Sequence, residues 1–474
     1  MSTTRQPTER DCAWFYYGLP SQPRLIARSS STSYRFGFDG WSSEPKTLTI
    51  VGKHDIVGKW NDEPSSLRKE VLDTLAEKKV DWQAVDIVRI GYVGEEMPVI
   101  LSISVVPGTL SWVVGDQVAG QCRNALLDHG LDDVHCEIKE SRLVNLASAP
   151  AVLQQDRHDH PLRWYSYIYQ LSDQLSTSIA SLDQPHREGT KGIHLRRAGG
   201  ESGEVLVLTC RHVCYGEREK GSRLPEEETL PSKSIIQLPG KTRDNLVVGL
   251  KSFNVRRARR SKQKKRRERP ATRDYGVQDP GFLSDWCLVQ LEARCHERHL
   301  SELSNRVYID GDDFDQRFPV RDTAVDVVQD RHHDRTIQVG GIVAVSELLD
   351  TSRTHIVGMR GQKSGLRFGL FNQVKSVVRR VYSDGPTFLS RECCVVADSA
   401  DSSSIFTKKG DSGACVFDLE GRAVGMVTAG IERGDLLQGN DDYGLDRAVD
   451  VTYVTPMEWL LADMKACGLS MEIF

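Results

Sequence analysis

Three features are scarce in this 474-residue sequence: long apolar runs, an excess of charge of one sign, and a regular pattern of cysteines. No stretch approaches the roughly 20 consecutive apolar residues that a membrane-spanning helix needs, so no membrane span is expected. The formal net charge of −4 is small for this length. It excludes a bulk attraction to nucleic acid or to anionic membranes.

The beginning of the sequence, MSTTRQPTERDCAW, lacks the apolar core and the small-residue cleavage site of a secretory signal. The cysteines are scattered, and their number, 11, is odd. In a chain without an export signal this pattern favours reduced thiols over disulfides. We therefore expect the protein in the cytoplasm or the nucleus.

The length of the chain predicts two or three domains. Residues 1–45 are rich in Ser, Arg and Pro and are expected to be irregular. Residues 46–150 alternate between strand and helix patterns in the order β-α-β-β-α-β, which predicts an α+β, ferredoxin-like domain with an antiparallel sheet and two helices on one face. The strands are expected at 47–54, 85–94, 98–108 and 134–144, and the helices at 64–78 and 111–130.

A helical connector is expected over residues 151–182. Within 160–181, Ile168, Leu171, Leu175 and Ile179 form one apolar stripe at helical spacing. From residue 183 to 474 the sequence changes to short strands and Gly-rich turns, which predicts an all-β barrel or sandwich.

The segment TKKGDSGACVFDLEGRAVGMVTAG, residues 407–430, contains the sequence Gly-Asp-Ser-Gly. These residue types are common in tight turns for conformational reasons alone, so the four letters do not identify a nucleophile. A nucleophilic Ser412 also requires a histidine to take its proton and a carboxylate to orient that histidine.

Two other segments contain residues of these types at the ends of apolar strands. EVLVLTCRHVCYG (204–216) contains His212, and FLSDWCLVQLE (282–292) contains Asp285. Either residue alone is compatible with a structural role or a solvated position. Their order along the chain, His, Asp and then Ser, is the order found in chymotrypsin-like peptidases.

These three segments together resemble the trypsin-like serine peptidases, also called chymotrypsin-like. GTKGIHLR (189–196) is similar to the first barrel strand of that family, and YVTPMEWLLADM (453–464) resembles the closing helix of its intracellular and bacterial members. The resemblance covers roughly residues 176–470 and leaves residues 1–150 outside. It implies a multidomain, mainly-β protein, with a double β-barrel preceded by the α+β domain.

The resemblance implies a role for each residue of the triad. His212 would act first as general base and then as general acid, Asp285 would orient it, and Ser412 would attack the scissile carbonyl to form an acyl-enzyme. The amides of Gly410 and Ser412 would form the oxyanion hole. Such a reaction needs neither a metal nor a cofactor, so none is expected.

The resemblance also places the substrate pocket. Phe406 is expected at its floor, and Thr428, Ala429 and Gly430 along its wall. Because no acidic residue stands at the floor position, cleavage after Lys or Arg is not implied. A small or apolar residue on the amino side of the scissile bond is expected.

The sequence departs from the family in two respects. It contains no Arg-Ile-Val-Gly-Gly type junction to provide a new N-terminal amine for Asp411, so another partner must satisfy that carboxylate, or the loop is held inactive. Cys210 and Cys214 flank the histidine as CRHVC, but further zinc ligands at convincing spacing are missing. A role as small apolar core residues is favoured for both thiols.

A basic run, RRARRSKQKKRRERP, occupies residues 256–270 with ten basic residues and one Glu. Such a block is expected to be an exposed insertion. A solvated loop, a nuclear-import signal and contact with a polyanion all remain open. No aromatic residue is interleaved to stack on bases, so nucleic acid is not the expected partner.

The sequence therefore predicts a serine endopeptidase that acts on a protein or peptide. The alternative is a catalytically silent pseudoprotease that serves as a protein-binding scaffold. A third reading treats the N-terminal domain and the basic run as a nucleic-acid adaptor. The oligomeric state is not indicated by the sequence.

Overall fold

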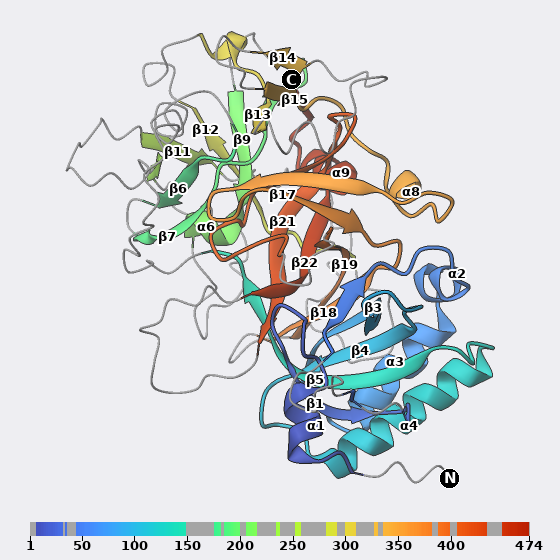
Figure 1. Ribbon diagram of the computed structural model, residues 1–474. Coiled ribbons are helices and arrows are strands. Elements are labelled where there is room, and N and C mark those ends of the chain that lie inside the picture. The colour runs from blue at the N-terminus through green and yellow to red at the C-terminus, as the bar shows by residue number, and fades with distance from the viewer. Residues whose placement is uncertain are drawn as a thin grey trace, which may run out of the picture.

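The structure is a computed structural model of the chain, coloured from the N-terminus to the C-terminus in Figure 1. It describes residues 6–31, 34–35, 44–147, 175–181, 184–199, 205–215, 234–237, 252–256, 281–291, 299–309, 327–329, 335–381, 387–398, 405–433 and 448–473.

The first segment contains regular structure, so the expectation of an irregular stretch over 1–45 is wrong for its described part. Helix α1 (Glu9–Trp14) starts at Thr8, whose hydroxyl accepts a hydrogen bond from the N–H of Asp11. The Asp11 carboxylate accepts from the N–H of Thr8 in return, a reciprocal N-terminal cap. Strand β1 (Arg24–Arg28) pairs with the first half of β5 (His135–Asn145). Five residues with an arginine at each end give too weak a strand pattern to be recognised in the sequence.

Residues 44–147 form an α/β unit that contains both predicted helices, as α3 (Ser66–Glu77) and α4 (Trp112–Asp128), and a short additional helix, α2 (Ile56–Asn61). The hydroxyl of Ser65 accepts from the N–H of Arg68, and that of Ser111 from the N–H of Val114, so both long helices have N-terminal caps. The apolar stripe of α3 is buried together with that of α4 against one face of the sheet (Figure 1).

All four predicted strands of this unit are present, as β2 (Lys46–Thr49), β3 (Trp82–Tyr92), β4 (Val99–Val105) and β5. They pair in the order β2-β3-β4-β5-β1, and β4 and β5 run parallel. A ferredoxin-like sheet was expected to be antiparallel throughout, so this expectation is wrong in the direction of β5 relative to β4. The reason is that α4 carries the chain back to the starting end of β4, which makes the next strand a parallel neighbour.

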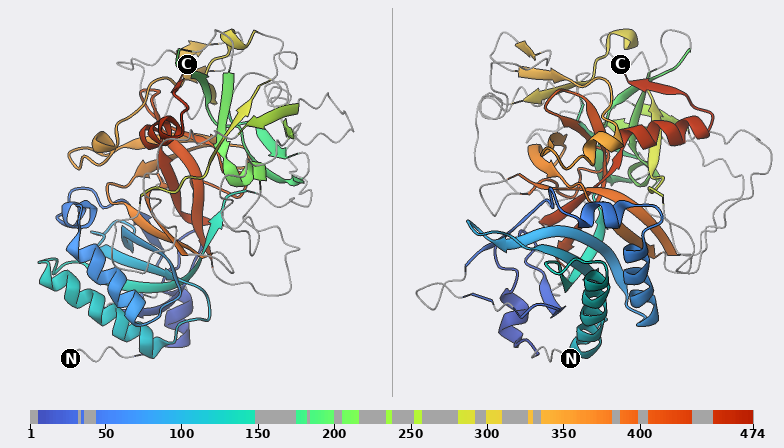
Figure 2. Two further views of the ribbon diagram at one scale, coloured as in Figure 1. Left: turned by 180° about the vertical axis from the view of Figure 1, so that it is seen from behind. Right: turned by 90° about the vertical axis from the view of Figure 1, so that its right-hand side faces the viewer.

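The N-terminal unit is joined to the rest of the chain through one twelve-stranded sheet. The sheet begins with the strands β1, β5, β4 and β3 of the N-terminal unit, with β2 also paired to β3. It continues in the order β18 (Ser376–Val381), β19 (Thr387–Ala397), β17 (Gly365–Phe371), β16 (Ile356–Gly361), β20 (Cys415–Asp418), β21 (Ala423–Arg433) and β22 (Val449–Pro456). The link is the pairing of β3 with β18 (Ser376–Val381). A second link is the pairing of residues 141–145 of β5 with β21 (Ala423–Arg433) (Figure 1). The α/β unit therefore lies directly against the C-terminal half of the chain, as both views in Figure 2 show.

Buried polar side chains cross this junction. Asp86 of β3 accepts hydrogen bonds from the hydroxyl of Ser376 at 2.6 Å and from that of Tyr453 at 2.9 Å. Asn372 donates to the carbonyl of Ile87 at 2.8 Å and accepts from the N–H of Val51 at 3.0 Å. A buried polar group without a partner is costly, so these bonds favour one relative placement of the two parts.

Six strands of the C-terminal half form a closed cycle of antiparallel pairs: β16 (Ile356–Gly361), β17 (Gly365–Phe371), β19 (Thr387–Ala397), β22 (Val449–Pro456), β21 and β20 (Cys415–Asp418). Its apolar cluster includes Met359, Phe371, Val395, Val416 and Val454, all at most 1% exposed. A closed cycle leaves no open sheet edge among these strands.

A second, eight-stranded sheet lies beside the cycle, in the order β23-β8-β9-β12-β11-β10-β6-β7. These strands are β6 (Ser178–Ser181), β7 (Gln184–Thr190), β8 (His194–Arg197), β9 (Val205–Cys210), β10 (Ser234–Gln237), β11 (Ser252–Arg256), β12 (Trp286–Gln290) and β23 (Met471–Ile473). Closure of this sheet into the first barrel stays a prediction.

The helix expected over 160–181 is wrong at its end, because residues 178–181 are strand β6, held between β10 and β7. The rest of the predicted stripe, up to residue 174, lies outside the described residues. So do residues 257–270 of the basic run; its first residue, Arg256, ends β11.

The remaining described elements are four short helical segments and a small third sheet. They are helix α6 (Arg211–Tyr215), a 3-10 turn (Leu300–Glu302), a small sheet of β13 (Arg306–Ile309), β15 (Arg335–Gln338) and β14 (Val327–Gln329), helix α8 (Val345–Leu348) and helix α9 (Met457–Ala466). The closing helix predicted at 453–464 is α9, although its first four predicted residues belong to β22.

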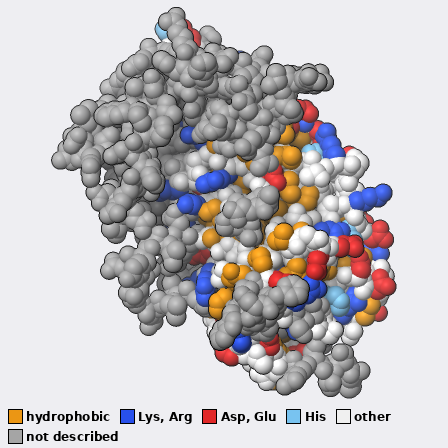
Figure 3. All heavy atoms as spheres, viewed as in Figure 1, with side chains coloured by type: hydrophobic (Ala, Val, Ile, Leu, Met, Phe, Trp, Pro, Cys, Tyr) orange, Lys and Arg blue, Asp and Glu red, His pale blue; other side chains and the backbone are white. Residues whose placement is uncertain are grey.

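Among the described helices, none combines the length and the apolar character needed to cross a membrane. On the face drawn in Figure 3, acidic and basic side chains lie interspersed over the described part of the N-terminal unit. The cellular compartment stays a prediction.

Candidate active site

His212 and Asp285 are brought together by the pairing of β9 with β12. In this antiparallel pair Cys210 lies opposite Trp286, so the chain leaving β9 and the chain entering β12 run side by side. The N–H of Arg211 donates to the carbonyl of Asp285 at 2.8 Å, which extends the ladder by one bond. Helix α6 then starts and directs His212 over the end of the sheet.

The three residues predicted as a triad form one chain of short contacts. Nδ1 of His212 lies 2.5 Å from Oδ2 of Asp285, and Nε2 lies 2.8 Å from Oγ of Ser412. The backbone N–H of His212 also donates to Oδ1 of Asp285 at 3.2 Å. With both carboxylate oxygens engaged, the imidazole is fixed in position, and its Nε2 faces the serine hydroxyl.

The environment of Asp285 keeps its carboxylate ionised. Burial acts to raise its pKa, but the neighbouring charge of His212 and its hydrogen bond act against burial, helped by Arg380 and Arg211. The net result is a pKa below the ordinary value of an aspartate. An anionic Asp285 favours the tautomer of His212 that carries its proton on Nδ1 and leaves Nε2 free to accept one.

Ser412 lies in a loop whose two glycines cannot readily be replaced. Gly410 has φ +111° and Gly413 has φ +94°, a backbone conformation that residues with a side chain rarely adopt. A Cβ on Gly413 would also lie 2.3 Å from Oγ1 of Thr209 and 2.5 Å from the carbonyl oxygen of Thr190. The two glycines of the Gly-Asp-Ser-Gly sequence are therefore required by the shape of this loop.

Asp411 is satisfied by backbone amides, which answers the question raised by the missing activation junction. Its Oδ1 accepts from the N–H of Lys363 at 2.8 Å and of Ser364 at 3.2 Å, and its Oδ2 from the N–H of Lys408 at 2.8 Å. Burial raises the pKa of this carboxyl, and the hydrogen bonds counteract part of that rise. The loop that contains Ser412 is thus held by contacts that need no new N-terminal amine.

Of the residues predicted to form the substrate pocket, Thr428 contacts Ser412 directly. The carbonyl of Thr428 is 3.3 Å from Oγ of Ser412, and Thr428, Ala429 and Gly430 follow one another along β21. Phe406 is 1% exposed and belongs to the apolar cluster inside the strand cycle. A substrate pocket formed by these residues stays a prediction.

The amides of Gly410 and Ser412 converge on one acceptor, the carbonyl oxygen of Leu146. The distances from this oxygen are 2.5 Å to the nitrogen of Gly410 and 3.2 Å to that of Ser412. Leu146 directly follows β5, and its side chain is fully buried in the cluster that contains Phe406. Sequence reasoning missed this residue, because NLA (145–147) resembles any short apolar segment at the end of a strand.

The described residues contain one cluster of metal-ligand type, formed by Cys210, His212 and Asp285, whose ligand atoms lie within 4.8 Å of one another. The contacts to Asp285 and Ser412 already engage both ring nitrogens of His212. Burial raises the pKa of Cys210 well above its ordinary value, so the thiol stays protonated and donates to the carbonyl of Val427. A protonated thiol is a poor ligand, and the cluster fits the triad better than a metal.

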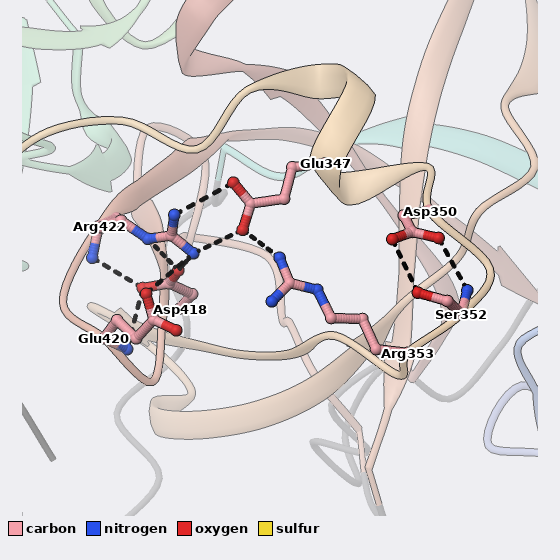
Figure 4. Close-up of polar contacts among 7 residues, drawn as sticks. All are labelled: Glu347, Asp350, Ser352, Arg353, Asp418, Glu420 and Arg422. Atoms are coloured by element: carbon pink, nitrogen blue, oxygen red, sulfur yellow. Dashed lines mark hydrogen bonds and ion pairs between the residues drawn. The ribbon is translucent and has the colours of Figure 1, made fainter. Parts of the chain in front are cut away.

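A cluster of ionic contacts supports the hairpin that follows Ser412 (Figure 4). Arg422, between β20 and β21, donates to both carboxylate oxygens of Glu347 in α8 at 2.9 and 3.1 Å and to Asp418 at 2.8 Å. Arg353 contacts the same Glu347 from the other side. The cluster ties α8 to the turn of this hairpin.

No protein-family model and no curated protein matches the sequence. Among solved structures, the chain is similar to Thermobifida fusca protease A, with 14% identity and a TM-score of 0.29 over 64% of this chain and 100% of that one. Cellulomonas bogoriensis chymotrypsin gives 13% identity and a TM-score of 0.27 over 64% and 98%. A glutamic acid-specific serine protease with a histidine triad in substrate binding gives 12% and 0.30 over 64% and 100%. Values this low assign the chain to no family.

Proposed function

We propose that this protein is a serine endopeptidase that hydrolyses peptide bonds through an acyl-enzyme. The observation that carries the proposal is the unbroken sequence of contacts from Asp285 through His212 to Ser412. Ser412 attacks the scissile carbonyl while Nε2 of His212 takes its proton. His212 then gives that proton to the leaving amine. Water then attacks the ester in the same way, with His212 again as the base, and this step releases the acyl group and restores Ser412.

The two amides that converge on one carbonyl oxygen support the same mechanism. A tetrahedral intermediate places negative charge on the former carbonyl oxygen, and rigid N–H donors stabilise that charge more than they stabilise the neutral carbonyl. Gly410 and Ser412 supply two such donors. Removing one donor of this kind typically costs about 10²–10³ in rate, so a loop fixed through Asp411 is an advantage.

The substrate is proposed to be a protein or peptide with an apolar residue before the scissile bond. Phe406 at the pocket floor leaves an incoming Lys or Arg without a carboxylate partner, and a buried unpaired charge is strongly disfavoured. No metal or cofactor takes part in the proposed steps.

A second candidate is the catalytically silent scaffold, and one observation favours it. The cleft beside Ser412 is filled by the protein's own Leu146, which would exclude other peptides as long as it stays in place. Under this reading the folded site would bind peptide segments without cleaving them.

Labelling with a fluorophosphonate probe separates the two candidates. We expect covalent labelling of the full-length protein and none of Ser412→Ala or His212→Ala. A set of fluorogenic peptides with Leu, Lys or Asp before the reporter should show preference for Leu. Since Leu146 fills the cleft, the same measurements are made on Leu146→Asp, in which an unfavourable buried charge should empty it. Failure of both proteins to label above the Ser412→Ala background would refute the peptidase and support the scaffold.

A further inference from the structure

The segment that fills the cleft is arranged as a peptide substrate would be. Residues 141–145 pair antiparallel with β21, and in this register Val144 lies opposite Gly430 and Asn145 opposite Ala429. Ala429 and Gly430 belong to the pocket wall. An extended peptide added to the edge of a sheet in this way is held by its main chain, and its side chains are left to fill pockets.

The carbonyl of Leu146 occupies the position where charge would develop during peptide cleavage. Its oxygen accepts from Gly410 and from Ser412, whose own hydroxyl is 2.8 Å from the histidine base. The carbonyl of the residue that precedes a scissile bond needs this environment. Two donors on one oxygen also orient the carbonyl, so this is a specific placement.

The side chain of Leu146 lies in the apolar cluster that contains Phe406, the residue proposed for the pocket floor. It is 0% exposed and packs in the apolar cluster with Phe406, Ala414, Val424 and Val427. A leucine also matches the preference for an apolar residue that Phe406 predicts. Backbone, carbonyl and side chain thus agree in placing Leu146 immediately before a scissile bond.

We infer that the protein cleaves its own chain between Leu146 and Ala147. The inference rests on the proposed function, since it uses the same triad. Oγ of Ser412 bonds to the carbonyl carbon of Leu146 and passes its proton to Nε2 of His212. The bond from that carbon to the nitrogen of Ala147 then breaks, and this nitrogen takes the proton. Water hydrolyses the ester and leaves a carboxylate on Leu146 and a free Ser412.

Cleavage at this bond would not separate the two products. Residues 1–146 keep β3 paired with β18, the contacts of Asp86 with Ser376 and Tyr453, and the bond from Trp60 to the carbonyl of Lys375. The new carboxyl end stays beside Ser412 until residues 141–146 leave β21. Self-cleavage therefore yields a two-chain protein whose cleft is first occupied by its own product.

The test follows the full-length chain by gel electrophoresis and by N-terminal sequencing of the smaller products. Wild type should give two fragments, the second starting Ala147-Ser148-Ala149, whereas Ser412→Ala stays intact. Leu146→Asp should slow cleavage by at least about a hundredfold, because the pocket would have to bury a charge. Leu127→Asp, the same change on a leucine of α4 that is 44% exposed, is the matched control and should be cleaved like wild type.

Two measurements show whether the reaction is intramolecular. The rate of cleavage should not change when the protein is diluted a hundredfold. Ser412→Ala mixed with an excess of wild type should stay intact at 146–147. Both measurements remain decisive if Leu146→Asp fails to fold, since Ser412→Ala removes only one oxygen atom.

The outcomes separate this inference from the proposed function. A wild-type chain that stays intact while Ser412 labels with the fluorophosphonate probe overturns self-cleavage and leaves the peptidase standing. Cleavage at another bond, or cleavage whose rate rises with concentration, also overturns it. If wild type neither cleaves nor labels, and Leu146→Asp does not label either, both proposals fail.

Discussion

The two halves of strand β5 are both held by backbone pairing but have different roles. Residues 135–140 pair with β4 and 137–140 also with β1, within the N-terminal unit. Residues 141–145 pair with β21, whose Thr428 lies beside Ser412. Lys139 in the first half forms a buried ion pair. The second half leads to the carbonyl of Leu146, which accepts hydrogen bonds from the amides of Gly410 and Ser412. Backbone pairing positions the chain in both halves. The residues around each half determine whether it stabilises the fold or contacts the candidate site.

The first half is anchored by an ion pair that is shielded from water. Nζ of Lys139 lies 3.7 Å from Oδ2 of Asp450 on β22, and the two side chains are 1% and 0% exposed. Asp450 also accepts from the N–H of Ser21 at 2.8 Å and from the Ser21 hydroxyl. Three segments far apart in the sequence therefore meet at one carboxylate.

Replacing Lys139 by Met should have the largest effect on stability. It leaves the Asp450 charge buried without its cation, which typically costs about 3–5 kcal/mol. We expect a corresponding fall in the free energy of unfolding, measured by urea denaturation. Labelling of Ser412 at low temperature should be unchanged, because Lys139 contacts none of the triad residues.

A double variant provides the control for this comparison. Lys139→Met with Asp450→Asn removes both charges and should recover a large part of the stability lost by Lys139→Met alone. If the single variant is as stable as wild type, the first half of β5 is not anchored by this pair. If the single variant abolishes labelling of Ser412 in a folded protein, the two halves of β5 do not act independently.

The pH dependence of stability should depend on Glu392, which lies on β19 between the two links to the N-terminal unit. Burial raises its pKa to about 7, from an ordinary value of 4.5, although Arg380 and several hydrogen bonds oppose the rise. A folded-state pKa above the unfolded one favours the folded state most below about pH 4.5. This contribution to the free energy of unfolding, about 3 kcal/mol in total, is lost as the pH rises to about 7.

Glu392→Gln tests this dependence, because the amide keeps an oxygen acceptor for the N–H of Leu283 without a titrating group. Relative to wild type, the variant should be more stable at pH 8 than at pH 5, measured as urea midpoints. Glu420→Gln, on a glutamate whose side chain is 63% exposed, is the matched control and should follow wild type. If the urea midpoints of wild type and Glu392→Gln change identically with pH, Glu392 is not the source of the pH dependence of stability.

The smallest effect is expected where the same kinds of charge meet at the surface. Arg422 and Glu347 form a bidentate pair, but their side chains are 28% and 29% exposed. Water already solvates such charges, so Arg422→Met should lower the free energy of unfolding by only about 1 kcal/mol or less. A loss as large as that of Lys139→Met would show that burial does not explain the difference between the two pairs.

The sequence predicted those parts of the fold that depend on local patterns. In α3, Leu67, Val71 and Leu75 recur at helical spacing behind the cap at Ser65, and the helix lies within two residues of its predicted ends at both termini. The same reasoning failed at Ser178–Ser181, where an apolar stripe suggested helix. Pairing with β10 and β7 lies far beyond the reach of a local pattern, and it decided in favour of a strand.

The candidate site was also predicted only in part, because its side chains could be recognised in the sequence and its backbone contacts could not. Gly-Asp-Ser-Gly, with a histidine and an aspartate before it in the right order, led to three residues that the structure places within hydrogen-bonding distance. The partners of Asp411 were not predicted, because they are backbone amides, and every residue except proline has one. Leu146 was missed for a related reason, since its carbonyl is chemically like any other.

The sequence by itself determined the residue types that can do chemistry, the helices of the N-terminal unit and the glycines that the loop of Ser412 requires. Those properties reside in side chains and in local backbone preferences, which the order of residues states directly. Only the tertiary structure decided that β5 extends from one unit to the other. It also placed the carbonyl of Leu146, directly after β5, where it accepts hydrogen bonds from two amides. Backbone groups are the same at almost every position, so their roles depend on where folding places them.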